Sequence, residues 1–170
     1  MFTVRRVRVE EWEQLRDLRL RALRSDPLAF ATTFAAANER TEVQWQDWVR
    51  TGATSEWNCM VVAEEAPGTL LGLGAVFLQE HHFTLVSMWV DPSARGRGIG
   101  SALVETLLAW VDRTLPGADV RLDVNPEQEA AMALYRSHGF QETGGEEPLG
   151  HSPPATVRQM IRPGRPVRAR

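Results

Sequence analysis

A change of hydrophobic period near residue 91 constrains the fold of this chain more than any other feature. A strand-like period of two runs up to Val90, whereas from Leu103 to Val111 apolar residues recur with the helical period of about 3.6. A turn with glycines at 96, 98 and 100 separates the two patterns. A strand that passes through a short turn into an amphipathic helix predicts a sheet with helices packed on it.

The other elements are predicted from the same two periods and from turn residues. Strands are expected at 2–9, 59–63, 70–78, 83–90, 120–124, 140–143 and 155–161, and helices at 10–25, in two short pieces between 28 and 50, at 98–113 and at 127–137. The strands at 59–63, 70–78 and 83–90 form an antiparallel meander. The order predicts an α/β (α+β) fold, with a single domain at 1–163 and an Arg/Pro-rich tail at 164–170.

Composition excludes several functional classes. All 19 basic residues are arginine, which excludes mechanisms that need lysine, such as Schiff-base aldolases, pyridoxal-phosphate enzymes and P-loop NTPases. The net charge of −3 argues against a nucleic-acid partner, because such partners select basic surfaces. Four of the last nine residues are arginine, and a solvated tail is favoured there over a nucleic-acid-binding segment.

The sequence also predicts where the protein is located and whether it binds a metal. No segment approaches the roughly 18 apolar residues of a membrane span, and the N-terminus lacks the apolar core of a secretion signal, so a cytoplasmic protein without a membrane partner is expected. Cys59, the only cysteine, lies in an apolar strand and is expected to be buried and inert. The four histidines lack metal-binding spacing, and no metal site is predicted.

The turn at 95–101 is suited to binding an anion. The first N–H groups of a helix have no partner within it and lie at the positive end of its dipole. Glycines let a phosphate approach this backbone, and Arg95 and Arg97 can add charge-assisted hydrogen bonds. The alternative is a flexible loop with two solvated arginines. A dinucleotide fingerprint is disfavoured because Ser101 or Leu103 stands where its third glycine belongs.

Two motifs carry a family resemblance. Arg95, Gly98 and Gly100 satisfy the pattern [R/Q]-x-x-G-x-[G/A] just after a strand that ends in valine. The segment 131–140, Ala-Met-Ala-Leu-Tyr-Arg-Ser-His-Gly-Phe, is similar to an A-x-x-L-Y-x-x-x-G-F ending. Together they resemble the signature of the GCN5-related N-acetyltransferase (GNAT) superfamily, and the resemblance covers about residues 83–140 well.

This resemblance implies a fold and a cofactor. The fold is a mostly antiparallel sheet of six to seven strands, flanked by about four helices, whose central strands 83–90 and 120–124 splay apart. The cofactor is acetyl-CoA, with CoA as product; its pantetheine amides pair with the free strand edge and its pyrophosphate lies on the glycine-rich turn. The side chain of Trp89 is expected to pack into the sheet. The cofactor-binding residues predicted on this basis are Met88, Trp89, Val90, Arg95, Gly96, Arg97, Gly98, Ile99, Gly100, Ser101, Asn125 and Gln128.

Tyr135, the only tyrosine, is the predicted catalytic acid. A phenol with a pKa of about 10 keeps its proton at neutral pH and can protonate a thiolate whose conjugate acid titrates near 8.5. The alternative is a buried structural tyrosine. Gln128 stands where the family often has a cofactor-contacting asparagine; Asn125 either replaces it or caps the following helix ahead of Pro126.

The general base and the acceptor site are less determined. Strand residues 83–87 carry no carboxylate that could serve as the base. The candidate bases are therefore Glu80, His81 and His82, although the alternative is that these residues only form an exposed turn. Ser87 could at most position a water. By analogy, the N-terminal helices, the hairpin before Val90 and the loop 144–154 build the acceptor site. The aromatic and acidic residues expected there are Phe30, Phe34, Trp45, Glu39, Glu42 and Glu80, which would suit a cationic amine, although aromatics at helical spacing are also typical of a core.

The predicted function is transfer of an acetyl group from acetyl-CoA to a primary amine of a small molecule or peptide, by direct attack in a ternary complex. The main alternative is a non-catalytic acyl-CoA sensor or interaction module, which would bind the cofactor without releasing thiol. The resemblance also implies a homodimer.

Overall fold

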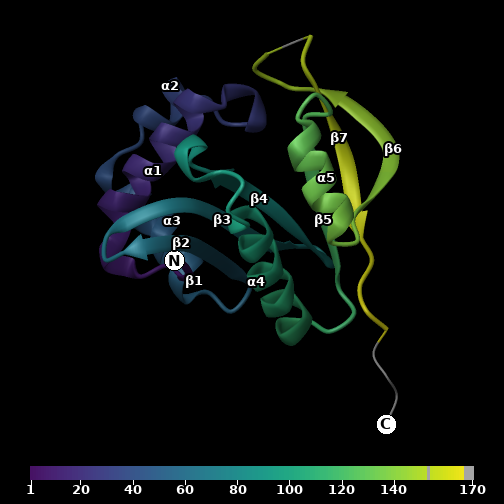
Figure 1. Cartoon of the computed structure of the whole chain (residues 1–170), viewed down its shortest axis with the longest axis horizontal. Coiled ribbons are helices and arrows are strands. Elements are labelled where there is room, and N and C mark those ends of the chain that lie inside the picture. Colours follow the sequence, from purple (N-terminus) through teal and green to yellow (C-terminus); the bar gives the residue numbers. More distant parts are fainter. Residues whose placement is uncertain (153, 167–170) are drawn as a thin grey trace.

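The computed structural model describes residues 1–152 and 154–166, which form a seven-stranded mixed sheet with helices on both faces (Figure 1). The strands lie in the order β1-β2-β3-β4-β5-β7-β6. Their bounds are β1 Thr3–Arg6, β2 Asn58–Ala66, β3 Thr69–Gln79, β4 His82–Val90, β5 Asp119–Val124, β6 Gln141–Pro148 and β7 Thr156–Arg162. Neighbouring strands are antiparallel except β4 and β5, which run parallel because a helix crosses over between them.

Five α-helices cover the two faces of this sheet in the described residues. They are α1 Trp12–Ser25, α2 Phe34–Asn38, α3 Glu42–Thr54, α4 Ile99–Thr114 and α5 Glu129–Ser137. Helices α1 to α3 lie on one face, and α4 and α5 lie on the other (Figure 1). Strand β2 serves both apolar cores, because Val61 packs beneath α4 and α5 while Met60 and Val62 pack beneath α1 to α3. Burial on both faces explains its continuous apolar sequence.

The sheet splits between β4 and β5. In the described residues, β4 pairs with β5 only at His82, Phe83 and Thr84, and the two strands diverge beyond Thr84. The predicted splayed pair is therefore confirmed. On its other edge β4 carries a bulge, where Ser87 adopts a positive φ of 59°.

The fold class and nearly all predicted elements are confirmed, with two corrections. Helix α5 begins at Glu129, because Asn125 Oδ1 accepts a hydrogen bond from the Glu127 N–H (2.9 Å) and forms a turn ahead of the helix. Asn125 is therefore not its cap. Strand β6 continues to Pro148, through part of the predicted 144–154 loop. All residues of β6 are exposed, so no apolar alternation indicates this extension in the sequence.

Gly164, predicted to begin a solvated tail, lies against the turn before β5, and residues 165 and 166 are exposed. The Gly164 N–H donates to Asp119 Oδ1 (2.8 Å), and a Cβ at this position would lie 2.0 Å from the Gly117 carbonyl oxygen. The rest of the predicted tail, 167–170, lies outside the described residues. Among the helices of the described part, none has the length and apolar character to cross a membrane.

Candidate active site

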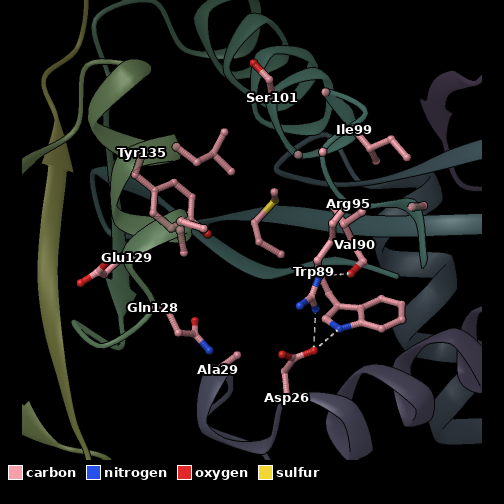
Figure 2. Close-up of a pocket in the computed structure, with 18 residues that line it drawn as sticks. Asp26, Ala29, Trp89, Val90, Arg95, Ile99, Ser101, Gln128, Glu129 and Tyr135 are labelled. Atoms are coloured by element: carbon pink, nitrogen blue, oxygen red, sulfur yellow. Dashed lines mark hydrogen bonds and ion pairs between the residues drawn. The ribbon is translucent and has the colours of Figure 1, made fainter. Parts of the chain in front are cut away.

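A cavity of about 550 Å³ opens where β4 and β5 diverge, between α4 and α5 (Figure 2). The end of β4, the glycine-rich turn, one face of α5 and the loop after α1 form its walls. Figure 2 shows Tyr135 pointing into it from α5, with Trp89 on the facing side and Ile99 and Ser101 at the α4 end. Its lining residues are Asp26, Ala29, Met88, Trp89, Val90, Ala94, Arg95, Gly96, Gly98, Ile99, Gly100, Ser101, Gln128, Glu129, Ala130, Ala131, Leu134 and Tyr135.

The glycine-rich turn presents N–H groups to this cavity. The Ala102 N–H makes the first bond of the helix, to the Gly98 carbonyl (3.1 Å), so the N–H groups of residues 99–101 have no partner within α4. Gly96 and Gly98 have φ values of 77° and 80°, and an added Cβ at either would meet nothing within 4 Å. The turn therefore needs glycine for its backbone, and the space in front of it can admit an anion.

Gly100 and Ser101 join α4 to α5. A Cβ on Gly100 would lie 3.2 Å from Leu134 Cδ2, so this glycine lets the two helices approach. The Ser101 hydroxyl lies 2.9 Å from Glu105 Oε1 and 3.0 Å from His138 Nε2. Gly100 and Ser101 both line the cavity, but the Ser101 hydroxyl already makes these two contacts within the protein.

Carboxylates hold the two arginines of the turn. Arg95 donates from Nη2 to Asp26 Oδ2 (2.8 Å) and from Nε to the Val90 carbonyl (3.0 Å). Trp89 Nε1 donates to the same Asp26 oxygen (2.7 Å), so one carboxylate joins the end of α1 to the cavity wall (Figure 2). Arg97 instead pairs with Glu65 (2.5 Å) and does not line the cavity, which differs from its predicted role.

Asp26 is stabilised in its charged form. Burial by itself would raise its pKa, but hydrogen bonds from Ser25, Trp89 and Arg95 outweigh that effect and hold the pKa of Asp26 below its ordinary value. Sequence analysis missed this residue, because Ser-Asp-Pro indicated only the end of a helix.

The edge of β4 that faces the split is partly occupied. The Asp91 N–H donates to the Leu71 carbonyl of β3 (2.8 Å), so the Val90 carbonyl in the same peptide unit points toward the split, where Arg95 binds it. The Val90 N–H faces the same way. The predicted pairing edge at 88–90 is therefore available at this N–H, while the carbonyl is engaged. The Trp89 side chain is 4% exposed and packs into the core beneath α1 to α3, as predicted.

Tyr135 combines burial with access to the cavity. Its side chain packs edge-on against Phe140, with ring centroids 5.8 Å apart. Burial raises the pKa of its hydroxyl above the ordinary value, so the phenol keeps its proton throughout the neutral range. Within the described residues the hydroxyl has no hydrogen-bond partner, and Figure 2 shows it directed into the cavity. Nearby, Gln128 lines the cavity, whereas Asn125 is 5% exposed and serves the turn before α5.

The residues predicted for the acceptor site are not brought together at this cavity. Glu80 lies in the turn before β4 and His82 begins the strand, whereas Met88 lies six positions further along it, roughly 20 Å away. Ser87 lines a different cavity, on the other face of the sheet. Phe30 is 5% exposed and belongs to the core, and Phe34 is half-buried against it.

Arginines cover the aromatic wall expected among the N-terminal helices. The guanidinium carbons of Arg19, Arg24 and Arg40 lie 4.4, 4.2 and 5.0 Å from the ring centroids of Phe30, Phe34 and Trp45, respectively. These three rings are therefore covered by guanidinium groups. The helical spacing of these aromatics reflects core packing, which is the commoner cause of such a pattern.

Asp123 is a second carboxylate that the sequence analysis overlooked. Leu122 and Val124 enter the core beneath α4 and α5, so the intervening Asp123 points to the opposite face of β5. Loss of solvent around the carboxylate, and then the charge of Glu147, raise the pKa of Asp123. In the sequence, the alternation of β5 predicts a strand from Val120, Leu122 and Val124, and Asp123 is the polar residue between the last two. Elsewhere, the described residues contain no group of three or more His, Cys, Asp or Glu side chains suited to a metal ion.

The sequence model of the acetyltransferase (GNAT) family matches residues 12–140. The chain belongs to this family. Curated GNAT relatives include N-alpha-acetyltransferase RimI of Mycobacterium tuberculosis, 36% identical over 49% of this chain and 52% of the relative. Peptidyl-lysine N-acetyltransferase YjaB of Escherichia coli is 28% identical over 86% of this chain and 87% of the relative. The chain spans about half the length of the first of these two.

Solved GNAT structures share the fold over nearly their whole length. Salmonella typhimurium yncA, a putative acetyltransferase solved with its cofactor acetyl-CoA, has a TM-score of 0.80 at 15% identity and covers 100% of this chain and 98% of its own. A GCN5-related N-acetyltransferase from Kribbella flavida has a TM-score of 0.77 at 24% identity, covering 95% and 97%. The GNAT family uses acetyl-CoA. The cavity fits that group, because free N–H groups and space without Cβ atoms meet at one end for a diphosphate.

Proposed function

We propose that this GNAT protein is an acetyl-CoA-dependent N-acetyltransferase that acts on a primary amine of a small molecule or peptide by direct attack in a ternary complex. One observation carries this proposal: a single cavity has N–H groups without a partner in α4 at one end and the hydroxyl of Tyr135 on its wall. A site for an anionic coenzyme and a protonated acid therefore face the same space. Acetyl-CoA, when bound, supplies an acetyl group activated as a thioester.

The N–H groups of residues 99–101 and the left-handed turn at Gly96 and Gly98 would bind the diphosphate through hydrogen bonds and the helix dipole. Arg95, which binds Asp26, would fix the shape of this turn more than it would contact the ligand. The Val90 N–H, which faces the split, would donate to the carbonyl oxygen as negative charge develops there. Gln128 would contact the coenzyme from the start of α5.

Tyr135 would act as the general acid. Its hydroxyl lies on the cavity wall, and its raised pKa keeps the proton on Oη throughout the neutral range, so the phenol would still carry a proton to donate when the thiolate departs. The described residues supply no hydrogen-bond acceptor for this hydroxyl, which leaves it free to face a ligand in the cavity.

The acceptor class is supported by the relatives. The N-alpha-amine and peptidyl-lysine specificities in the names of RimI and YjaB, and the spermidine N-acetyltransferase of Vibrio cholerae among the structural neighbours, all concern amines.

Two measurements test this function. Calorimetry should detect binding of CoA and acetyl-CoA, and thiol release should appear with at least one class in a panel of amino acids, polyamines, arylalkylamines and lysine peptides. Tight coenzyme binding without thiol release from any amine would instead identify a non-catalytic acyl-CoA-binding module. Absence of binding by either coenzyme would contradict both functions.

A further inference from the structure

A second cavity, of about 340 Å³, lies on the other face of the sheet, between α3 and strands β2 to β4. Its walls are mainly apolar, with two aromatic rings and a few polar groups at the rim. The lining residues are Asp47, Trp48, Thr51, Gly52, Asn58, Cys59, Met60, Ala75, Val76, Phe77, Val86 and Ser87. Nothing in the function proposed above uses this space.

The bulge in β4 brings the two cavities to adjacent residues. Leu73 pairs with Trp89 and Ala75 pairs with Val86, so Ser87 and Met88 together stand opposite Gly74. Ser87 lines the second cavity and Met88 lines the first. Their Cα atoms are about 3.8 Å apart, as in any trans peptide. The two cavities therefore lie on opposite faces of the sheet at one peptide unit of β4, the strand that borders the split.

The geometry of the bulge is specifically accommodated. Ser87 has a φ of 59°, which is uncommon for a residue other than glycine. A Cβ at Gly74 would lie 2.5 Å from Met88 Sδ, so this glycine makes the space that Met88 occupies. Strained backbone that its surroundings enforce in this way is concentrated at functional sites.

The aromatic walls of the second cavity are uncovered. Arginines stack on Phe30, Phe34 and Trp45, but among the described residues no arginine stacks on Trp48 or Phe77. Trp48 is half-buried and packs edge-on against Trp45, and Phe77 is 36% exposed. These two rings are therefore free to contact an apolar or aromatic group.

Two carboxylates lie across the split from β4, on β5 and β6. Thr84 pairs with Arg121, so Val86 in the second cavity and Asp123 on β5 each lie two residues beyond the last paired position. Asp123 points to the face that holds the second cavity, and Glu147 adds charge near it. An ammonium group placed here would be complementary to both carboxylates, in competition with the guanidinium of Arg121, which points to the same face of β5.

We infer that the second cavity binds the aromatic arm of the acceptor, so that the substrate class is a primary arylalkylamine whose nitrogen lies between Asp123 and the Ser87–Met88 bulge. This inference rests on the proposed function, because it assigns the acceptor side of the same reaction. Trp48 and Phe77 contact the ring, and the bulge admits the amine to the first cavity. Asp123 is a binding and positioning residue for the ammonium group.

The test uses the full chain with CoA bound and 2-phenylethylamine as the probe, followed by calorimetry. Thr51→Phe, on the exposed rim of the cavity, should fill it and weaken binding at least tenfold. Thr54→Phe adds the same ring to an exposed position of α3 outside the cavity and should leave binding unchanged. Phe77→Ala should weaken binding several-fold. CoA affinity should be the same in all three variants, which shows that the fold and the first cavity are intact.

Charge selectivity gives a second measurement. Asp123→Asn should weaken 2-phenylethylamine severalfold but leave binding of the neutral 2-phenylethanol unchanged, and in turnover it should raise KM more than it lowers kcat. Undetectable binding of 2-phenylethylamine, or equal binding to the Thr51→Phe and Thr54→Phe variants, would overturn the assignment. If cavity-dependent binding is found but no amine releases thiol, the acceptor site stands and the proposed catalytic function fails.

Discussion

Replacing Asp26 by alanine should destabilise the protein and loosen the wall of the coenzyme cavity. The substitution removes the acceptor for Trp89 Nε1 (2.7 Å) and for Arg95 Nη2 (2.8 Å). Trp89 is only 4% exposed, and a buried donor without a partner costs about 1–3 kcal/mol. The Arg95 side chain is 48% exposed, so water replaces its lost pair and the pair itself contributes only about 0–1 kcal/mol.

The expected total is about 1–4 kcal/mol of unfolding free energy, which for a chain of this length lowers Tm by roughly 2–16 °C. Denaturant unfolding followed by circular dichroism measures this loss. Asp17→Ala is the matched control, because it removes a carboxylate from the same helix whose side chain is 68% exposed and pairs only with Arg16. That control should change the unfolding free energy by less than about 0.5 kcal/mol.

The structure also predicts how the contribution of the Asp26 carboxylate to stability depends on pH. The pKa of Asp26 is lowered in the folded state, so its charge stabilises the protein above the ordinary aspartate pKa, and this contribution is lost as pH falls through the lowered value. The stability difference between wild type and Asp26→Asn should therefore be full at pH 7 and shrink in acid. An Asp26→Ala protein as stable as the Asp17→Ala control would refute the role assigned to this carboxylate.

Three further predictions follow from single contacts. Tyr135→Phe should lower kcat in thiol release by about 10²–10⁴ with coenzyme affinity unchanged, and an unaltered kcat would remove this residue from the mechanism. Gly98→Ala should lower the free energy of unfolding by about 1–2 kcal/mol and weaken CoA binding in calorimetry. Gly68→Ala is its control, because Gly68 has the same φ of 80° in a hairpin turn and its replacement should cost the same stability without affecting CoA binding. Equal CoA affinities of the two variants would contradict the placement of the diphosphate. Asp112→Ala leaves the Arg162 guanidinium, which is 7% exposed, without its bidentate partner and should cost about 3–5 kcal/mol in denaturant unfolding, while a loss below about 1 kcal/mol would refute this.

Local patterns in the sequence predict most of the fold. The strand, glycine turn and helix around residues 83–113 depend on spacings of two to four residues, and these spacings can be read directly from the order of apolar residues and glycines in the sequence. Gly139 ends α5 with a φ of 86°, as its position after the helix indicates. By contrast, β6 carries no apolar alternation, because neither of its faces is buried, and its full length was therefore invisible to the same reasoning.

The parts of the site that tertiary contacts create could not be inferred in this way. Asp26 meets Trp89 and Arg95 across 63 and 69 residues of chain, and nothing in the intervening sequence encodes that contact. The second cavity likewise depends on how α3 rests on β2 to β4. The sequence alone revealed the family motifs, and it predicted an anion-binding turn and a role for Tyr135, because these are properties of short segments. Packing decided which arginine faces the coenzyme cavity, which aromatic rings stay uncovered and where Asp123 points, because those outcomes depend on contacts between segments that only the folded chain brings together.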